Sequence, residues 1–175
     1  METLLKVVAG FREKKIEVPR IMTAGSLTFD LDLAYLYPRI GQETFLQVSP
    51  GTWIYWDSEY NRLMPGGFEF AALILAQVID TSTNNRITLN LGHKRWGADR
   101  GPVDLFSRSD LKVVSFNEEH TVLQVETDKS FKIGDYLLIV PKHVCSTVNL
   151  FEFFSVIGED GTVERSEEPV DGRNR

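Results

Sequence analysis

The sequence predicts a mainly β protein: a C-terminal domain like a β-barrel or β-sandwich over residues 31–175, preceded by a helix and a strand over residues 1–30. After residue 30, short apolar and β-branched runs alternate with turn-forming residues, which is typical of such all-β domains. Residues 1–30 instead show helical spacing followed by one buried strand and a Gly-Ser turn. The length of 175 residues fits one domain, or one domain plus a fragment of another.

The N-terminal segment predicts a piece of an α/β architecture. Leu4, Leu5, Val8 and Phe11 recur at helical spacing, so residues 1–17 are expected to form a helix that ends before Pro19. The stretch "RIMTAGS", residues 20–26, predicts a short buried strand that enters a turn. A TIM-type barrel needs eight such units and about 250 residues. We therefore expect residues 1–30 to be a remnant of an α/β (TIM-type) barrel.

The second domain is predicted from strand-like runs at short intervals. The stretch "ALILAQVI" also suits a helix by composition, but β-branched residues follow it and helix caps are missing, which favours a strand. The polar tail "EEPVDGRNR" is expected to be mobile. In order, the predicted strands are "TFLQV", "TWIYWD", "FEFAALILAQVID", "RITLNLG", "LKVVSF", "TVLQVET", "YLLIVPKHVC", "FFSVI" and "TVERSEE".

Composition excludes several function classes. Hydrophobic residues make up 42% and charged residues 25% of the chain, as in ordinary globular proteins. The net charge of −6, without a basic stripe, argues against nucleic-acid binding. A single cysteine allows no internal disulfide and favours a cytoplasmic location. The longest apolar stretch is interrupted by Gln77 and falls short of the roughly 20 residues that span a bilayer, so no membrane partner is expected. The first residues do not form a secretory signal.

A histidine and the single cysteine lie two positions apart in "VPKHVCSTVNLF", residues 140–151. On an extended backbone the side chains of His143 and Cys145 would share one face, about 7 Å apart along the strand. Imidazole and thiolate together suit zinc best among the common metals. Two protein ligands would leave positions open to water or substrate. On spacing alone, the more common alternative is a small buried cysteine beside a surface histidine.

The order of several motifs strengthens the metal hypothesis. "PKHVCSTVNL" resembles the metal-binding signature of the D-threonine aldolase and D-serine dehydratase family, pyridoxal-phosphate enzymes with an alanine-racemase-type barrel and a C-terminal β domain. "TAGSLTF", "SPGTWIYWD" and "NEEHTVLQV" resemble further stretches of that family, in the same order. "RITLNLGHK" resembles another, with Asn90 where aspartate is usual. The resemblance runs from about residue 1 to residue 172.

The resemblance implies roles for four residues. His143 and Cys145 would bind zinc or another divalent metal, and Gly25 and Ser26 would contact the phosphate of pyridoxal phosphate. A glycine turn can also form an anion-binding nest on physical grounds, although a simple strand-to-loop turn is the alternative. None of the eight lysines occupies the context of the family's Schiff-base lysine, so no catalytic residue is assigned.

Two functions of different class follow. In the first, the chain is the C-terminal portion of a metal-activated lyase acting on D-β-hydroxy amino acids, inactive alone because the barrel is missing. Aldol cleavage and dehydration both stay open, although a cysteine ligand leans toward zinc and a dehydratase-like site. A barrel-containing N-terminal half and a homodimeric assembly are compatible with this function. In the second, the chain is a stand-alone β-domain protein that binds a metal or a partner without catalysis.

The other two histidines have weaker claims to a role. His120 ends an "NEEH" turn and is most simply a turn residue bonded to the backbone. Its alternative role is a group near the metal, with Glu118 or Glu119 bonded to its second ring nitrogen. His93 follows Gly92 at the end of a predicted strand and is expected to be structural.

Overall fold

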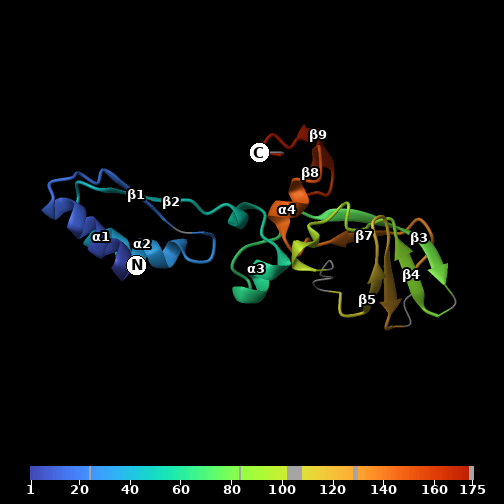
Figure 1. The fold of residues 1–175 in the computed structure, drawn as a ribbon. Coiled ribbons are helices and arrows are strands. Elements are labelled where there is room, and N and C mark those ends of the chain that lie inside the picture. Colours follow the sequence, from blue (N-terminus) through green and yellow to red (C-terminus); the bar gives the residue numbers. More distant parts are fainter. Residues whose placement is uncertain (24, 83, 102–107, 128–129, 174–175) are drawn as a thin grey trace. The chain divides into compact units, whose positions relative to one another are not determined.

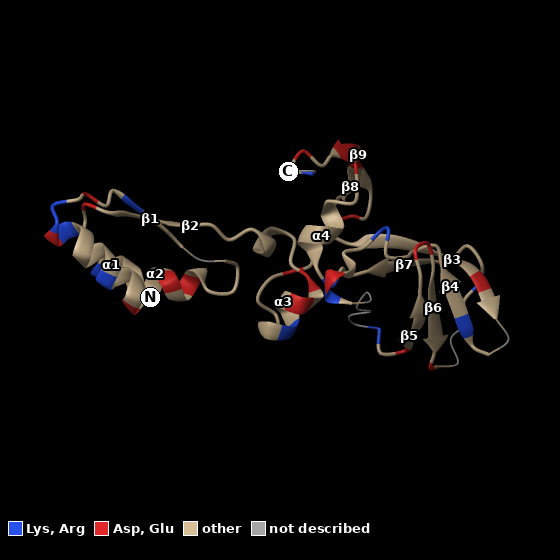
Figure 2. Cartoon of the chain, viewed as in Figure 1, with Lys and Arg blue, Asp and Glu red and all other residues tan. Residues whose placement is uncertain are grey.

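The computed structural model describes the chain except residues 24, 83, 102–107, 128–129 and 174–175. The chain divides into two compact units, Met1–Ile54 (unit 1) and Tyr55–Arg175 (unit 2) (Figure 1). Acidic and basic residues are scattered along the sequence of both units (Figure 2). Within the described part of the chain, no helix has the length and apolar character needed to cross a membrane.

Unit 1 is a helix followed by a β–α–β arrangement. Strands β1 and β2 pair in parallel, with Arg20 opposite Phe45 and Thr23 opposite Val48. Two parallel neighbours require a crossover connection, which a short helix supplies here. That helix was not predicted, because Asp30 and Asp32 alternate with leucines and hide the helical spacing. The elements are α1 (Glu2–Glu13), β1 (Arg20–Thr23), α2 (Phe29–Leu36), the 3-10 turn η1 (Tyr37–Arg39), β2 (Phe45–Val48) and the 3-10 turn η2 (Thr52–Ile54).

The compact unit extends beyond the predicted 1–30 segment because β2 belongs to it. The stretch "TFLQV" forms a strand as expected, but this strand pairs with β1. A side chain also ties the two parts together, since Arg12 donates to Thr44 Oγ1 at 2.8 Å and forms an ion pair with Glu43 at 2.7 Å. The origin of residues 1–30 in a larger barrel stays a prediction.

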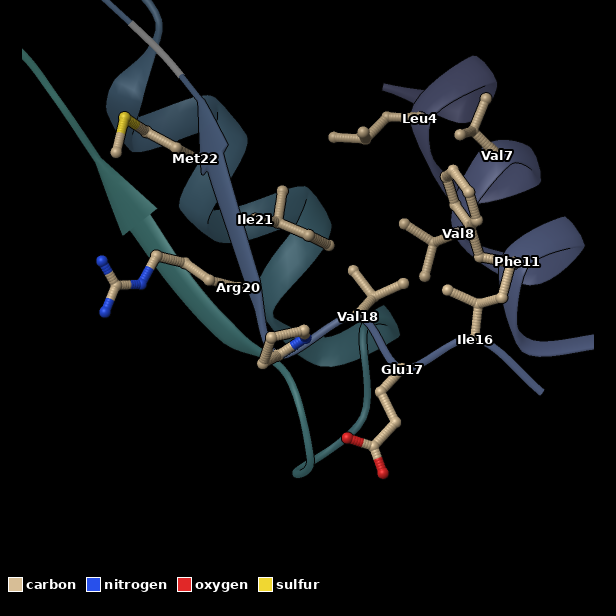
Figure 3. Close-up of a pocket in the computed structure, with 11 residues that line it drawn as sticks. Leu4, Val7, Val8, Phe11, Ile16, Glu17, Val18, Arg20, Ile21 and Met22 are labelled. Atoms are coloured by element: carbon tan, nitrogen blue, oxygen red, sulfur yellow. The ribbon is translucent and has the colours of Figure 1, made fainter.

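The core of unit 1 is small and leaves an apolar groove open. Val8, Ile21, Leu36 and Ile40 are its buried residues. A groove of about 490 Å³ lies between α1 and β1. In Figure 3, Ile21 of β1 points toward α1 whereas its neighbours Arg20 and Met22 point away. The alternation is that of an extended strand with one covered face.

Unit 2 is built on a curled antiparallel sheet of five strands in the order β5-β6-β4-β3-β7. A separate antiparallel hairpin of two strands, β8 and β9, follows near the C-terminus. The strands are β3 (Ile74–Ser82), β4 (Arg86–Leu89), β5 (Leu111–Phe116), β6 (Thr121–Val125), β7 (Tyr136–Ile139), β8 (Phe153–Ile157) and β9 (Val163–Pro169). The remaining elements are α3 (Ser58–Leu63), the 3-10 turn η3 (Ala98–Arg100) and α4 (Val144–Val148). The predicted mainly β fold class is confirmed.

One face of the sheet forms a continuous core. Ile74, Ala76 and Val78 are buried at every second position of β3, and β6 shows the same alternation. This period of two confirms that "ALILAQVI" forms a strand. The buried residues of this core are Ile74, Ala76, Val78, Ile87, Leu89, Leu91, Trp96, Leu111, Leu123, Val125, Leu137 and Ile139.

Two of the predicted strands are wrong, at least in part. The stretch "TWIYWD" forms the turn η2 and then the start of α3. Trp56 has a positive φ of 52° while its ring is fully buried, and Asp57 caps α3 by accepting from Tyr60 N at 2.8 Å. The stretch "YLLIVPKHVC" is extended only through its first residues, because β7 ends at Ile139 and α4 begins at Val144.

Candidate metal-binding site

His143 is the N-terminal cap of α4, and Cys145 is the second residue of that helix. The backbone of His143 is extended, with φ −133° and ψ 102°, whereas residues 144–148 are helical. The expectation that both residues lie on an extended strand is therefore wrong. Convergence of the two side chains no longer follows from strand spacing, and their joint binding of one ion stays a prediction. The thiol of Cys145 is exposed.

An aspartate far away in the sequence contacts the imidazole of His143. Asp99 lies in η3, and its Oδ2 is 2.5 Å from His143 Nδ1. Its other oxygen, Oδ1, accepts a hydrogen bond from Ser146 Oγ at 2.6 Å. One carboxylate therefore joins the cap residue of α4 to the third residue of that helix.

Electrostatics favour the ionised form of this carboxylate. The hydrogen bond from Ser146 lowers the pKa of Asp99 below its ordinary value, and the hydrogen bond and charge of His143 act in the same direction. Partial desolvation opposes them without reversing the shift. Asp99 is therefore a pure acceptor at neutral pH.

Backbone contacts place η3 against α4. Gly97 N donates to Thr147 Oγ1 at 2.8 Å, and the same hydroxyl donates to His143 O at 2.7 Å. A Cβ atom at Gly97 would lie 1.8 Å from Ser146 Oγ, so only glycine permits this approach. These contacts hold the loop that carries Asp99 beside the helix.

A second, fully buried carboxylate fixes the backbone of the same segment. Asp57 Oδ2 accepts from Val144 N at 3.0 Å, while its other oxygen caps α3 through Tyr60 N. Asp57 is 0% exposed. It therefore links the starts of α3 and α4. Through Val144 it also fixes the backbone next to His143, at the end of the connection from β7. The capping pattern "DSEY" was the only sequence signal for this role.

The chemistry of His143 fits a metal ligand. In metal-binding histidines the N–H of the second ring nitrogen characteristically donates a hydrogen bond to a carboxylate, which Asp99 supplies here. Cys145 offers a thiol of the type that zinc binds, two residues further on. Among the described residues, no group of three or more histidine, cysteine, aspartate or glutamate side chains could hold a metal ion. A complete coordination sphere would need groups beyond these two.

The remaining predicted site residues lie elsewhere. His120 ends the β5–β6 turn, where its backbone N–H donates to Asn117 Oδ1 at 2.9 Å. Glu118 and Glu119 both form ion pairs with Lys94, at 3.0 and 2.8 Å. These contacts agree with the structural role of His120. The backbone N–H of His93 donates to Asn117 O at 3.0 Å, as expected of a structural residue.

Gly25 and Ser26 lie between β1 and α2 in unit 1. Gly25 O accepts from the N–H groups of Thr28 and Phe29, at 3.1 and 3.2 Å. Ser26 is buried, and its Oγ accepts from Trp53 N at 3.0 Å. Thr23 Oγ1, at the end of β1, is a buried hydroxyl without a protein partner in the described structure. An unpartnered hydroxyl beside a glycine turn fits an anion site, and the phosphate role of Gly25 and Ser26 stays a prediction.

Comparisons with known proteins place these features in context. Residues 71–157 match the family model described as "Putative serine dehydratase domain". The chain is 29% identical to a D-threonine aldolase from an Arthrobacter species over 157 residues, which cover 87% of the chain and 39% of that enzyme. It is 27% identical over 110 residues to an uncharacterised protein of Mycobacterium tuberculosis, which cover 59% of the chain and 83% of that protein.

A solved structure shows the same fold. The crystal structure of D-threonine aldolase from Filomicrobium marinum superposes with a TM-score of 0.77 at 28% identity. The alignment covers 91% of this chain and 43% of the aldolase chain. The chain thus spans about two fifths of the aldolases that it matches. From the family model, the relatives and the shared fold, we conclude that the chain belongs to the D-threonine aldolase and serine dehydratase family and corresponds to a fragment of the C-terminal domain of these proteins.

Proposed function

We propose that the chain supplies the metal-binding β domain of a lyase that acts on D-β-hydroxy amino acids with the help of pyridoxal phosphate. The observation that carries this proposal is the contact between Asp99 and His143, two residues before the exposed Cys145. A histidine held in this way is suited to bind a divalent metal, and zinc is the metal that best suits an imidazole and a thiolate.

The roles of the chain's own residues follow from their contacts. His143 and Cys145 would be the protein ligands of the metal, while Asp99 and Asp57 orient the imidazole and the backbone. A metal bound there would supply Lewis-acid chemistry at a hydroxyl group. Gly25 and Ser26, with the unpartnered hydroxyl of Thr23 beside them, would hold the phosphate of the cofactor.

The proposal includes inactivity of the isolated chain. No lysine here occupies the context of the cofactor-binding lysine that the family resemblance implies, so that lysine would lie outside these 175 residues. A barrel-containing N-terminal half is the expected partner, and a homodimer and a cytoplasmic location stay predictions. With D-threonine, pyridoxal phosphate and zinc, the chain alone should give no product above a protein-free blank. Turnover by the chain alone would contradict this part.

The decisive experiment is metal uptake. The purified chain should bind close to one zinc ion, and His143→Ala and Cys145→Ala should each reduce uptake strongly. Glu118→Gln, whose carboxylate pairs with Lys94 outside the site, is the matched control and should bind like the parent. Equal zinc binding by parent and both alanine variants would remove the metal role of this pair.

Aldolase and dehydratase chemistry can be separated by product. A reconstituted enzyme that cleaves D-threonine would release glycine and acetaldehyde, whereas dehydration would release ammonia and 2-oxobutanoate. The cysteine ligand favours the dehydratase, since thiolate suits zinc. Acetaldehyde without ammonia would assign the aldolase reaction.

A stand-alone, non-catalytic β-domain protein is the second candidate function. It is favoured by the mycobacterial relative, 83% of whose length is covered by the match to this chain. This candidate also binds a metal or a partner at the site but needs no barrel. Failure to recover activity with any barrel-containing chain encoded nearby, together with intact zinc binding, would support it.

A further inference from the structure

We infer that Asp99 is a positioning residue that holds His143 in the tautomer with the proton on Nδ1, so that Nε2 keeps a lone pair for a metal. The inference rests on the proposed metal role of His143, but its first test needs no metal. Asp99 contacts neither substrate nor cofactor in this assignment and acts only through the imidazole.

The donor and acceptor inventory of the cluster leads to this tautomer. An ionised carboxylate accepts hydrogen bonds and donates none. Asp99 Oδ1 is occupied by Ser146 Oγ at 2.6 Å, and Oδ2 faces His143 Nδ1 at 2.5 Å. The contact between Oδ2 and Nδ1 is a hydrogen bond only if Nδ1 carries a proton. In the neutral ring Nε2 is then unprotonated, which is the form that binds a metal.

Among the described residues, one cation also approaches this carboxylate, but only at long range. Arg100 Nε lies 3.9 Å from Asp99 Oδ2, beyond hydrogen-bond distance and half exposed to water. The imidazole and the serine hydroxyl therefore make the two short side-chain contacts to Asp99 given above. Both belong to α4 or its cap, so these contacts tie the carboxylate to the start of that helix.

Hydrogen bonds hold the backbone of this cluster on two sides. The hydroxyl of Thr147 joins Gly97 N to His143 O, which fixes the distance between η3 and the helix start. Asp57 holds Val144 N from within unit 2. Rotation of the imidazole away from Asp99 would therefore break the short contact without any compensating backbone movement.

The first test measures the tautomer of His143 by nitrogen NMR of the metal-free chain. The parent and Ser146→Ala should both show the proton on Nδ1, because Oδ2 keeps its contact in each. Asp99→Asn removes the negative charge and replaces one carboxylate oxygen with an NH₂ group, which can donate to an unprotonated Nδ1, so the variant no longer requires a proton on Nδ1. We expect this variant to shift His143 toward the Nε2-protonated form. Glu118→Gln is the control and should match the parent.

The second test measures zinc affinity by competition with a chelator in the same chains. Asp99→Asn should bind zinc about 10–100-fold more weakly, the usual cost of losing a carboxylate behind a metal-bound histidine. Ser146→Ala should weaken binding by less, and it keeps the inference testable if Asp99→Asn misfolds. His143→Ala should lose most of the affinity.

The two readouts separate this inference from the proposed function. Suppose that the parent chain binds no zinc, but that His143 carries its proton on Nδ1 and loses this tautomer in Asp99→Asn. This result would contradict the metal role and would still support Asp99 as a positioning residue. Zinc binding that depends on His143, with tautomer and affinity unchanged in Asp99→Asn, would overturn the inference and leave the metal role intact.

Discussion

Unit 1 and unit 2 bury their apolar residues to different extents. In the described residues the core of unit 1 has four buried members, whereas that of unit 2 has twelve. On the groove side of unit 1, Val7 is 50% and Phe11 44% exposed. Its two strands pair with each other and leave the apolar groove beside β1 open.

The difference shows which part of the chain can stabilise itself. Five antiparallel strands with alternating burial close a core from their own residues. A parallel strand is normally covered on both faces, so a two-stranded parallel sheet with one small helix layer is marginal. The candidate metal site lies in the self-sufficient unit. The glycine turn that would hold a phosphate lies in the marginal one.

Separating the units should produce the largest effect. A chain of residues 55–175 should fold cooperatively, with dispersed amide signals in NMR spectra. A chain of residues 1–54 should be largely unfolded, because a segment of this size with a small core cannot offset its conformational entropy. Circular dichroism and thermal scans of both fragments provide the measurement. A cooperative unfolding transition in residues 1–54 alone would contradict the expectation that unit 1 cannot fold by itself.

Equivalent core deletions should then affect the units separately. Leu123 and Leu36 are both 0% exposed, one in each core. Leu123→Ala should lower the unfolding free energy of unit 2 by about 2–5 kcal/mol, through lost burial and the cavity left behind. In a Trp53→Phe background, which leaves Trp56 and Trp96 of unit 2 as the fluorescent reporters, it should shift urea unfolding followed by tryptophan fluorescence.

Leu36→Ala should act on unit 1 alone. Amide exchange in β1 and β2 should become faster, while the tryptophan-monitored transition stays where it is in the parent. A shift of that transition by Leu36→Ala would mean that the two units unfold together and are not independent folding units.

Alanine substitutions at two glycines should change stability by smaller amounts and in opposite directions. A Cβ atom at Gly92 would lie 2.4 Å from backbone atoms of Glu118 and Glu119, so Gly92→Ala should destabilise unit 2 by about 1–3 kcal/mol. Gly10 lies in α1 with nothing within 4 Å of its added Cβ, so Gly10→Ala should stabilise that helix by about 0.5–1 kcal/mol. Thermal midpoints compare the two variants, and equal signs would refute the argument.

The smallest expected effect is the pH dependence of the surface ion pairs of Lys94. The hydrogen bond from Lys94 lowers the pKa of Glu119, so this contribution is present above the ordinary value of 4.5 and is lost as pH falls through the lowered pKa. Bonds to Glu119 and Glu118 raise the pKa of Lys94, so its contribution is lost only as pH rises past 10.5.

Replacing the lysine tests that window. Lys94→Met should be slightly less stable than the parent from about pH 5 to 10, and the difference should shrink on either side. Urea titrations of residues 55–175 at several pH values measure it. A difference that persists unchanged well below pH 4 would assign the effect to lost packing of the lysine stem.

Regular local patterns account for what could be predicted without coordinates. The period of two in "ILAQV" and "TVLQV" identifies β3 and β6, because one-sided burial imposes alternation on the residues themselves. Helical spacing in residues 1–17 likewise predicts α1, which ends four residues early at Glu13. The order of short motifs also sufficed to identify the family.

Pairings across long sequence separations were decided only in the tertiary structure. Partners 44 and 87 residues apart, Asp99 with His143 and Asp57 with Val144, turn a predicted strand end into the capped helix α4. The strand "TFLQV" is recognisable from its residues, yet its parallel partner β1 depends on a crossover through the unpredicted α2. A pattern records which side of a segment is apolar. Which distant carboxylate or strand edge meets it depends on how the whole chain closes its core and satisfies its buried hydrogen bonds.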